Sequence, residues 1–314
     1  MGRTRNDGFD RAMEHVKRLA ADVAARGRGR GVVSDLVMVV AAVVAFGCAS
    51  AGPRVERGPL IQRSHDLYRL PLAGDSRIAH EIRLRPGEVI DTDRLLRLTG
   101  EQLRRRVRGA DVVLVGERHD SLADHHLQWR VMRLLEPRKP AIGLEMLPYT
   151  KQPTIDRYLR GEISEREMLR RIDWRRTWGF DVELYRPFWR FARRIAAPLL
   201  ALNEPASVVR QVGRHGLASL SPEIRRRLPT IDLSSTAHRA LFFYMIGGLH
   251  HHRGGRRPSP HHGSRFRGRM RHFYEAQSLW DEAMAARVLA QLRRESGRPV
   301  LVIAGKGHLL YGLG

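Results

Sequence analysis

The chain has 314 residues, 42% of them hydrophobic, which is enough for one large domain or two modest domains with a sizeable core. It carries 56 Lys and Arg against 33 Asp and Glu, a formal net charge of +23, and the basic residues are almost all arginines spread along helical segments. Without a compact basic tail or a nucleic-acid motif, this charge predicts no nucleic-acid partner; it favours a basic pocket for an anionic ligand, or simply a solvated Arg-rich surface.

The first predicted element is an export signal that ends at Cys48, the single cysteine of the chain. A polar, basic stretch precedes the apolar run Leu36–Gly47, which is too short to span a bilayer comfortably and suits the core of such a signal. The segment is similar to a bacterial lipoprotein signal, so we expect residues 1–47 to be removed and Cys48 to be lipidated. Two alternatives stay open: ordinary cleavage at Ala49-Ser50-Ala51, and an uncleaved N-terminal anchor.

Residues 48–74 are rich in Gly, Pro and Arg and predict a tether between a membrane and a folded domain. We therefore expect the protein at the bacterial cell envelope, on the outer membrane or its periplasmic face. A β-hairpin is predicted next, from His80–Leu84 and Glu88–Asp91 around the Arg85-Pro86-Gly87 turn. A short helix over Thr99–Val107 follows.

Four apolar runs separated by helical segments then predict a mainly parallel central sheet in a three-layer α/β domain over residues 75–314. A long helical insertion, about 205–296, precedes the last strand. It contains a histidine-rich loop that matches no closed zinc pattern and predicts an adventitious metal-binding segment. The predicted strands are Asp111–Gly116, Ala141–Met146, Pro198–Asn203 and Val300–Gly305.

Ionisable or amide side chains follow every one of these strands. The first and last strands both run into Gly-x-x-His, which places His119 and His308 at the same edge, with Glu145 on a neighbouring strand between them. Because the carboxyl ends of parallel strands share one edge, where ligands gather, we expect these groups to form one site. The full set is Glu117, His119, Asp120, Glu145, Asn203, Glu204 and His308.

Two further features accompany this set. On a helix predicted over His272–Arg293, Gln277 and Asp281 stand four residues apart beside the apolar stripe. They are predicted either to orient a site histidine or to bond loop backbone. An aromatic cluster between Trp174 and Trp189 predicts core, with the wall of an apolar ligand pocket as the alternative.

Together these motifs resemble the ChaN-like haem-binding lipoprotein family, over about residues 75–314. That family belongs to a superfamily with the Tiki proteases, the TraB proteins and the erythromycin esterases. The resemblance rests on several ordered motifs: Gly116-Glu117-Arg118-His119-Asp120, His125-His126-Leu127-Gln128, Gly143-Leu144-Glu145-Met146, Trp178-Gly179-Phe180, Leu202-Asn203, Tyr274-Glu275-Ala276-Gln277, Trp280-Asp281 and Gly305-Lys306-Gly307-His308.

The resemblance implies a haem-binding envelope lipoprotein for haem or iron uptake, with haem or a related tetrapyrrole as ligand, a lipid anchor in the membrane, and a homodimer as one arrangement. Related sequences continue past the last strand, so we expect the C-terminal edge here to be incomplete. Residues implied to contact the ligand or support those that do are Asp120, His125, His126, Asn203, Gln277 and Asp281.

The alternative implied by the wider superfamily is a hydrolase, either esterase-like or protease-like. In that case Glu117, His119, Glu145 and His308 would be catalytic. His119 would act as general base, or His119, Glu145 and His308 would bind a divalent metal that activates water.

Overall fold

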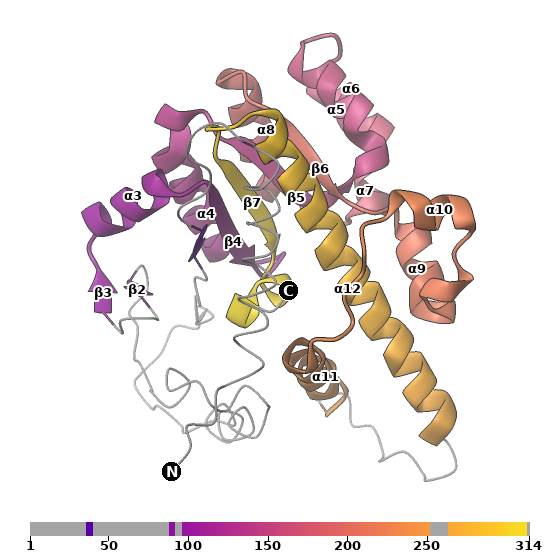
Figure 1. The fold of residues 1–314 in the computed structure, drawn as a ribbon. Coiled ribbons are helices and arrows are strands. Elements are labelled where there is room, and N and C mark those ends of the chain that lie inside the picture. Colours follow the sequence, from indigo (N-terminus) through magenta and orange to yellow (C-terminus); the bar gives the residue numbers. More distant parts are fainter. Residues whose placement is uncertain (1–35, 40–87, 92–95, 252–262, 313–314) are drawn as a thin grey trace, which may run out of the picture.

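The computed structural model describes residues 36–39, 88–91, 96–251 and 263–312 (Figure 1). Strands and helices alternate through most of this part. The strands are β1 (Leu36–Val39), β2 (Val89–Asp91), β3 (Leu96–Leu98), β4 (Val112–Glu117), β5 (Ala141–Pro148), β6 (Leu199–Asn203) and β7 (Val300–Gly305). The α-helices are α3 (Gly100–Gly109), α4 (Leu122–Leu135), α5 (Gln152–Leu159), α6 (Glu165–Ile172), α7 (Trp174–Thr177), α8 (Val182–Arg194), α9 (Ala206–His215), α10 (Pro222–Arg227), α11 (Thr236–His251) and α12 (Gly263–Arg294). Short 3-10 turns are η2 (Glu136–Arg138), η3 (Tyr149–Lys151), η4 (Leu217–Ser219), η6 (Lys306–His308) and η7 (Leu310–Gly312).

The central sheet has the strand order β1-β4-β7-β5-β6, and every neighbouring pair is parallel. Its four core strands are the four that the apolar runs predict. The last strand in sequence, β7, lies between β4 and β5, with Glu117 opposite Gly305 in the register. This corrects the expected arrangement, in which the Glu145 strand lay between the two histidine strands: here the His308 strand is the central one.

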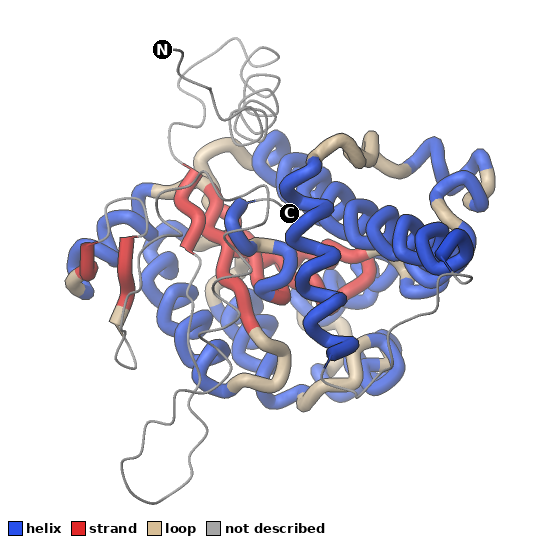
Figure 2. The backbone as a smooth tube through the Cα atoms, turned by 90° about the horizontal axis from the view of Figure 1, so that it is seen from below, coloured by secondary structure: helices blue, strands red, loops and turns tan. Residues whose placement is uncertain are grey.

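Helices cover both faces of the sheet (Figure 2), so the α/β architecture with three layers is confirmed. Alternate residues of β4 and β7 enter two different cores, as buried parallel strands require. Val113 and Ile303 face the core under α4 and α8, whereas Val112 and Val302 face α12. Tyr185, Phe188 and Trp189 of α8 are fully buried in the first core, which confirms the core interpretation for that part of the aromatic cluster.

The N-terminal hairpin exists, but its strands are not the predicted pair. The strand at Glu88–Asp91 pairs with the downstream residues Leu96–Leu98, in the antiparallel register Val89 to Leu98. The predicted partner, His80–Leu84, lies outside the described residues. The helix predicted next is confirmed as α3. It begins after Thr99, whose hydroxyl accepts from the Gln102 amide while the Gln102 side chain accepts from the Thr99 amide.

Strand β1 was not predicted, because its residues fall in the run expected to form the export signal. Leu36–Val39 is an apolar, β-branched segment, and it adds to β4 as a parallel edge strand. Residues 1–35 and 40–87, which include Cys48 and the tether, lie outside the described residues, so the signal and its lipidation stay predictions. No helix in the described part of the chain is long and apolar enough to cross a membrane.

The predicted helical insertion consists of α9, α10, α11 and α12. The last of these is longer than expected: it begins at Gly263, nine residues before His272, because the arginine-rich turns there lack the apolar stripe that marks a buried helix. Helix α12 crosses one face of the sheet, with Met284 and Val288 in its core, and α9 packs on its outer side.

Candidate functional site

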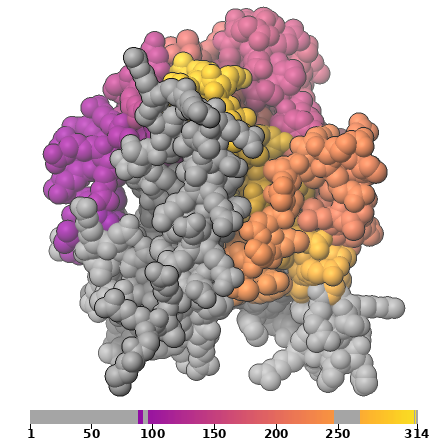
Figure 3. Space-filling model, viewed as in Figure 1, coloured from indigo at the N-terminus to yellow at the C-terminus, as the bar shows by residue number. Residues whose placement is uncertain are grey.

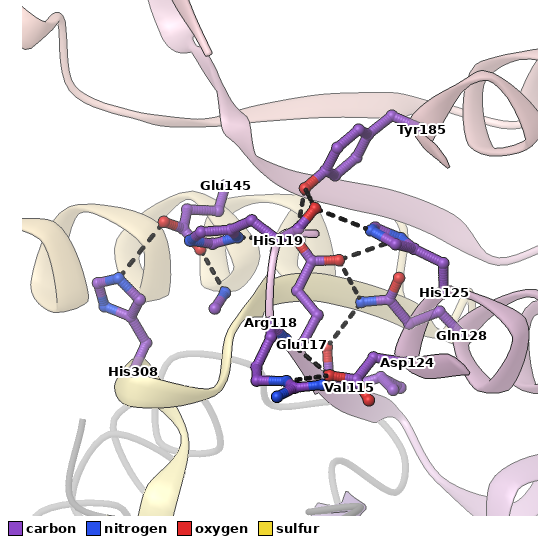
Figure 4. Close-up of polar contacts among 11 residues, drawn as sticks. Val115, Glu117, Arg118, His119, Asp124, His125, Gln128, Glu145, Tyr185 and His308 are labelled. Atoms are coloured by element: carbon purple, nitrogen blue, oxygen red, sulfur yellow. Dashed lines mark hydrogen bonds and ion pairs between the residues drawn. The ribbon is translucent and has the colours of Figure 1, made fainter. Parts of the chain in front are cut away.

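The site lies at the carboxyl edge of the sheet, where β4, β7 and β5 deliver Glu117, His119, His308 and Glu145 (Figure 4). The two Gly-x-x-His loops run side by side there. A Cβ at Gly116 would lie 3.1 Å from the Lys306 Cα, which is tighter than ordinary packing. Glycine at position 116 therefore allows the two loops to approach as closely as they do.

Glu117 is the centre of the first group of polar side chains, and its own side chain is fully buried. Its Oε1 accepts hydrogen bonds from the Tyr185 hydroxyl at 2.7 Å and from the His119 Nδ1 at 2.9 Å. Its Oε2 accepts from the Gln128 amide at 2.9 Å, and the His125 Nδ1 lies 3.2 Å from it. Both carboxylate oxygens thus have partners, which a buried charge requires.

Tyr185 acts as a fixed donor in this group. Burial raises the pKa of the Tyr185 hydroxyl far above its usual range, and the adjacent Glu117 carboxylate raises it further. The hydroxyl therefore keeps its proton at any physiological pH and donates it to Glu117.

His119 is held in one tautomer by this arrangement. Because its Nδ1 donates to Glu117, the neutral ring has its lone pair on Nε2, free to accept a proton or bind a metal centre. The His119 side chain is 29% exposed. Its ring meets the edge of Trp178 with centroids 4.6 Å apart and lies 5.1 Å from the ring of Phe180, which is 37% exposed.

A second group is centred on His308, in the turn after β7. Its Nδ1 donates to Asp281 Oδ1 at 2.5 Å, and its Nε2 lies 3.4 Å from Glu145 Oε1. Gln277 Nε2 donates to the Asp281 carboxylate and lies 2.8 Å from the His308 Nδ1. Gln277 and Asp281 thus both contact His308, and their role in orienting a site histidine stays a prediction.

The charges of His308, Glu145 and Asp281 in this second group depend strongly on one another. Burial alone would lower the pKa of His308, but the Glu145 and Asp281 carboxylates raise it to about 10. Burial alone would raise the pKa of Glu145, yet His308 and the Gly305 amide bring it below its ordinary value. At neutral pH His308 is therefore a cation between two carboxylates.

The second group extends to α11 through His238. The Nε2 of His238 lies 3.5 Å from Asp281 Oδ2, and its Nδ1 lies 3.4 Å from the Tyr274 hydroxyl. Burial lowers the pKa of His238 despite the nearby Asp281. On the next turns of α11, the Met245 methyl lies 3.2 Å from the position of a Cβ at Gly307. Helix α11 thus lies directly against the second Gly-x-x-His loop.

The two groups meet at Gly305. Its amide donates to Glu145 Oε2 at 2.5 Å, and a Cβ at this position would lie 2.9 Å from the His119 Cε1 and 3.4 Å from Glu145 Oε2. Glu145 is therefore close to both histidines. Each histidine also has a second carboxylate on its Nδ1, Glu117 for His119 and Asp281 for His308.

Not every predicted residue joins this site. Asp120 is exposed. His126 is exposed too, because successive residues of helix α4 are rotated by about 100° and its neighbour His125 faces the core. Asn203 lies at the end of β6 and accepts from the Glu204 amide, away from the histidines. Glu204 itself is held by Arg287 of α12. The residues brought together are Glu117, His119, His125, Glu145, Gln277, Asp281 and His308.

Three residues of the site were not predicted from the sequence. Tyr185 stood within the aromatic cluster expected to be core, Gln128 on the buried face of α4, and His238 on an apolar helix. A polar group on an otherwise buried helical face is the signal that could have found them, because such a group must have a partner.

His119, Glu145 and His308 lie near one another, but the described residues contain no group of three or more His, Cys, Asp or Glu side chains arranged to hold a metal ion. Their predicted role as metal ligands therefore gains no support from the geometry and stays a prediction.

A family model described as haem-binding uptake, Tiki superfamily, ChaN matches residues 103–314. Among solved structures, one described as cofacial haem binding to ChaN of Campylobacter jejuni has a similar fold, with a TM-score of 0.50 and 19% sequence identity, over 70% of this chain and 79% of that chain. No curated protein matches the sequence.

Proposed function

This chain belongs to the ChaN haem-binding uptake family of the Tiki superfamily, and from that premise we propose that it binds haem and serves haem or iron uptake at the bacterial cell envelope. The observation that carries the proposal is the family match over residues 103–314, which include the whole site. Haem would supply an iron centre and a flat, largely apolar ring system with two carboxylates.

The side chains at the carboxyl edge of the sheet are of the types that bind such a ligand. Trp178 and the exposed Phe180 form an aromatic ledge beside His119, suited to one face of a flat ring. His119 presents the Nε2 lone pair that an axial ligand needs, with Nδ1 fixed by Glu117. Arg118 and Lys306, both exposed, are the cations on the two loops and would pair with the propionates.

Titration with hemin tests this proposal. We expect the purified full chain to shift the Soret band, and His119→Ala to weaken hemin binding about ten- to hundredfold, because the ring that faces the ledge is lost. His126→Ala is the matched control: this histidine is exposed on α4 and should leave affinity unchanged. A chain that gives no Soret shift, or an H126A effect as large as that of H119A, contradicts the proposal.

The envelope location depends on Cys48, which we propose as the lipidated first residue of the mature protein. Its support is the apolar run that ends at the single cysteine of the chain. The mass of the mature N-terminal peptide from membranes decides the matter: a diacylglyceryl adduct is expected, and a free amine at Ala49 or Gly52 would contradict it.

A second candidate function is hydrolysis of an ester or amide. The observation in its favour is the pair of carboxylate-supported histidines that flank Glu145, an arrangement richer than ligand binding requires. The His119 Nε2 would take a proton from water, and Glu117 would stabilise the resulting imidazolium. A divalent metal would supply an activated water at the same groups.

Gly305→Ala tests the hydrolase candidate without removing any ionisable group. The added methyl would displace His119 from Glu145, so we expect hydrolysis of a simple aryl ester to fall about a hundredfold, as it should in His119→Ala. Gly109→Ala is the control, because a Cβ at that position would meet no other atom within 4 Å. Gly297→Ala is unsuitable as a control because the positive φ of Gly297 would strain an alanine. Equal hydrolysis rates in the native chain, Gly305→Ala, His119→Ala and Gly109→Ala would eliminate the hydrolase candidate. Loss of hydrolysis when a chelator is added would show that the reaction depends on a metal.

A further inference from the structure

A short turn between α7 and α8 carries the two rings that contact His119. Trp178 and Phe180 lie on either side of Gly179, with ring centroids 4.6 and 5.1 Å from that of His119 and 5.6 Å from each other. Helices α5 and α6, which precede α7, form the pink lobe at the upper right of Figure 3. The turn leads from this lobe into α8, and none of its three residues belongs to a helix or strand.

Trp174 holds this turn through both its backbone and its side chain. Its carbonyl accepts hydrogen bonds from the amide of Trp178 at 2.9 Å and from the amide of Gly179 at 3.2 Å. Its indole Nε1 donates to the carbonyl of Phe180 at 2.8 Å. One residue is therefore bonded to three consecutive residues of the turn, and the indole N–H is the bond that reaches Phe180.

The indole of Trp174 is itself fixed by the core. Its ring lies 5.3 Å from the ring of Tyr185 and 5.5 Å from the ring of Trp189, and both of these side chains of α8 are fully buried. A ring packed against two buried rings has one orientation, because protein cores are close-packed. Tyr185 also donates to Glu117, which holds His119. The ledge and the His119 ring are thus aligned on the same buried tyrosine.

We propose that Trp174 is a positioning residue, which holds the Trp178 and Phe180 rings in place for a flat ring ligand. The inference rests on the proposed function, in which this aromatic ledge meets one face of the ligand. Trp174 is only 8% exposed and acts through the turn. Without its indole N–H the turn would open more often, and the ligand would bind only to the fraction of molecules in which the ledge is in place. Stacking needs no iron, so a metal-free porphyrin should depend on Trp174 as hemin does.

Trp174→Phe in the full chain tests the proposal, with Trp189→Phe as the matched control. Both substitutions remove an indole from the same buried cluster and leave a phenyl ring there. The Trp189 Nε1 has no hydrogen-bond partner among the described residues, so only Trp174→Phe loses a bond to the turn. We expect Trp174→Phe to weaken hemin and protoporphyrin IX about fivefold each, the effect of one hydrogen bond, and Trp189→Phe to leave both affinities nearly unchanged.

Amide hydrogen exchange in the ligand-free chain gives a readout that needs no porphyrin. The amides of Trp178 and Gly179 should exchange about fivefold faster in Trp174→Phe, and at the native rate in Trp189→Phe. Gly179→Ala is a second variant, which leaves the core untouched. Gly179 is exposed and has φ +86°, so an alanine strains the turn from the solvent side and should also weaken both porphyrins.

The outcomes separate this proposal from that of haem binding. Equal affinities in the two tryptophan variants, or equal exchange rates of the two amides, overturn the role of Trp174, because core packing alone would then hold the turn. A loss for hemin without one for protoporphyrin IX overturns it too, because the ledge would not be what Trp174 controls. A native chain without a Soret shift contradicts haem binding instead, and the exchange rates still decide whether Trp174 holds the turn.

Discussion

Glu117→Ala should lower the free energy of unfolding by about 3 to 5 kcal/mol. The carboxylate is fully buried and accepts hydrogen bonds from Tyr185, His119 and Gln128. Its removal would take the nearest acceptor from each donor and leave Tyr185 and Gln128 only their longer contacts, to the His119 carbonyl at 3.3 Å and the Val115 carbonyl at 3.5 Å. A buried polar group that loses its partner costs about 1 to 3 kcal/mol. The cavity left by the side chain adds to the loss.

Urea denaturation at neutral pH measures this effect, with two comparison variants. Glu117→Gln keeps the size and one acceptor oxygen, so it should lose less than Glu117→Ala. Glu162→Ala removes an exposed surface carboxylate that pairs with Arg157 and Arg160, so it should lower the stability far less than Glu117→Ala. A Glu117→Ala loss no larger than that of Glu162→Ala would show that the buried network contributes nothing to stability.

His308→Gln should destabilise the protein by about 3 to 5 kcal/mol near pH 6, because Glu145 and Asp281 would remain buried without their shared cation. It should also change the pH dependence of stability. The pKa of His308 is raised to about 10 in the folded protein, so its contribution is complete below the unfolded value near 6.5 and is lost as the pH rises through 10.

The lowered pKa of Glu145 acts in the opposite direction. Its contribution is present above the ordinary value of 4.5 and is lost as the pH falls through the lower folded value. The native chain should therefore be most stable between about pH 4.5 and 6.5 as far as this pair is concerned. Between pH 6.5 and 10 it should lose stability while His308→Gln stays nearly flat. Parallel denaturation profiles over that interval would refute the coupling, and His126→Gln should follow the native profile.

Local patterns in the sequence predict the strands well. The four core strands appear within two residues of their expected bounds, because a continuous run of Val, Leu and Ile is typical of a parallel strand covered on both faces. The hairpin was less well predicted. Two short strands with three residues each leave little periodicity to decide which neighbours pair.

The site was predicted to the extent that it depends on strand ends. Glu117, His119, Glu145 and His308 share one edge because parallel strands deliver their carboxyl ends together. Asp120, His126 and Asn203 were predicted by the same local rule or by family motif, but they face solvent or another partner. Which side a residue faces after a strand ends depends on the conformation of the loop, and no periodic pattern records it.

By itself the sequence determined where the strands end and which ionisable groups follow them, because both depend on the local hydrophobic pattern. It also determined that the two Gly-x-x-His loops lie at one edge of the sheet, because parallel strands end at the same edge. Only the tertiary structure decided that β7 enters between β4 and β5, and so brings His308 against Glu145 across Gly305. It also decided that Tyr185 and Gln128 close around Glu117, and that His238 of α11 reaches Asp281. The contacts of Gln128 and Tyr185 with Glu117 join residues 11 and 68 positions apart, and the contact of Gly305 with Glu145 joins residues 160 positions apart. Strand order and helix docking are set by how the whole core packs.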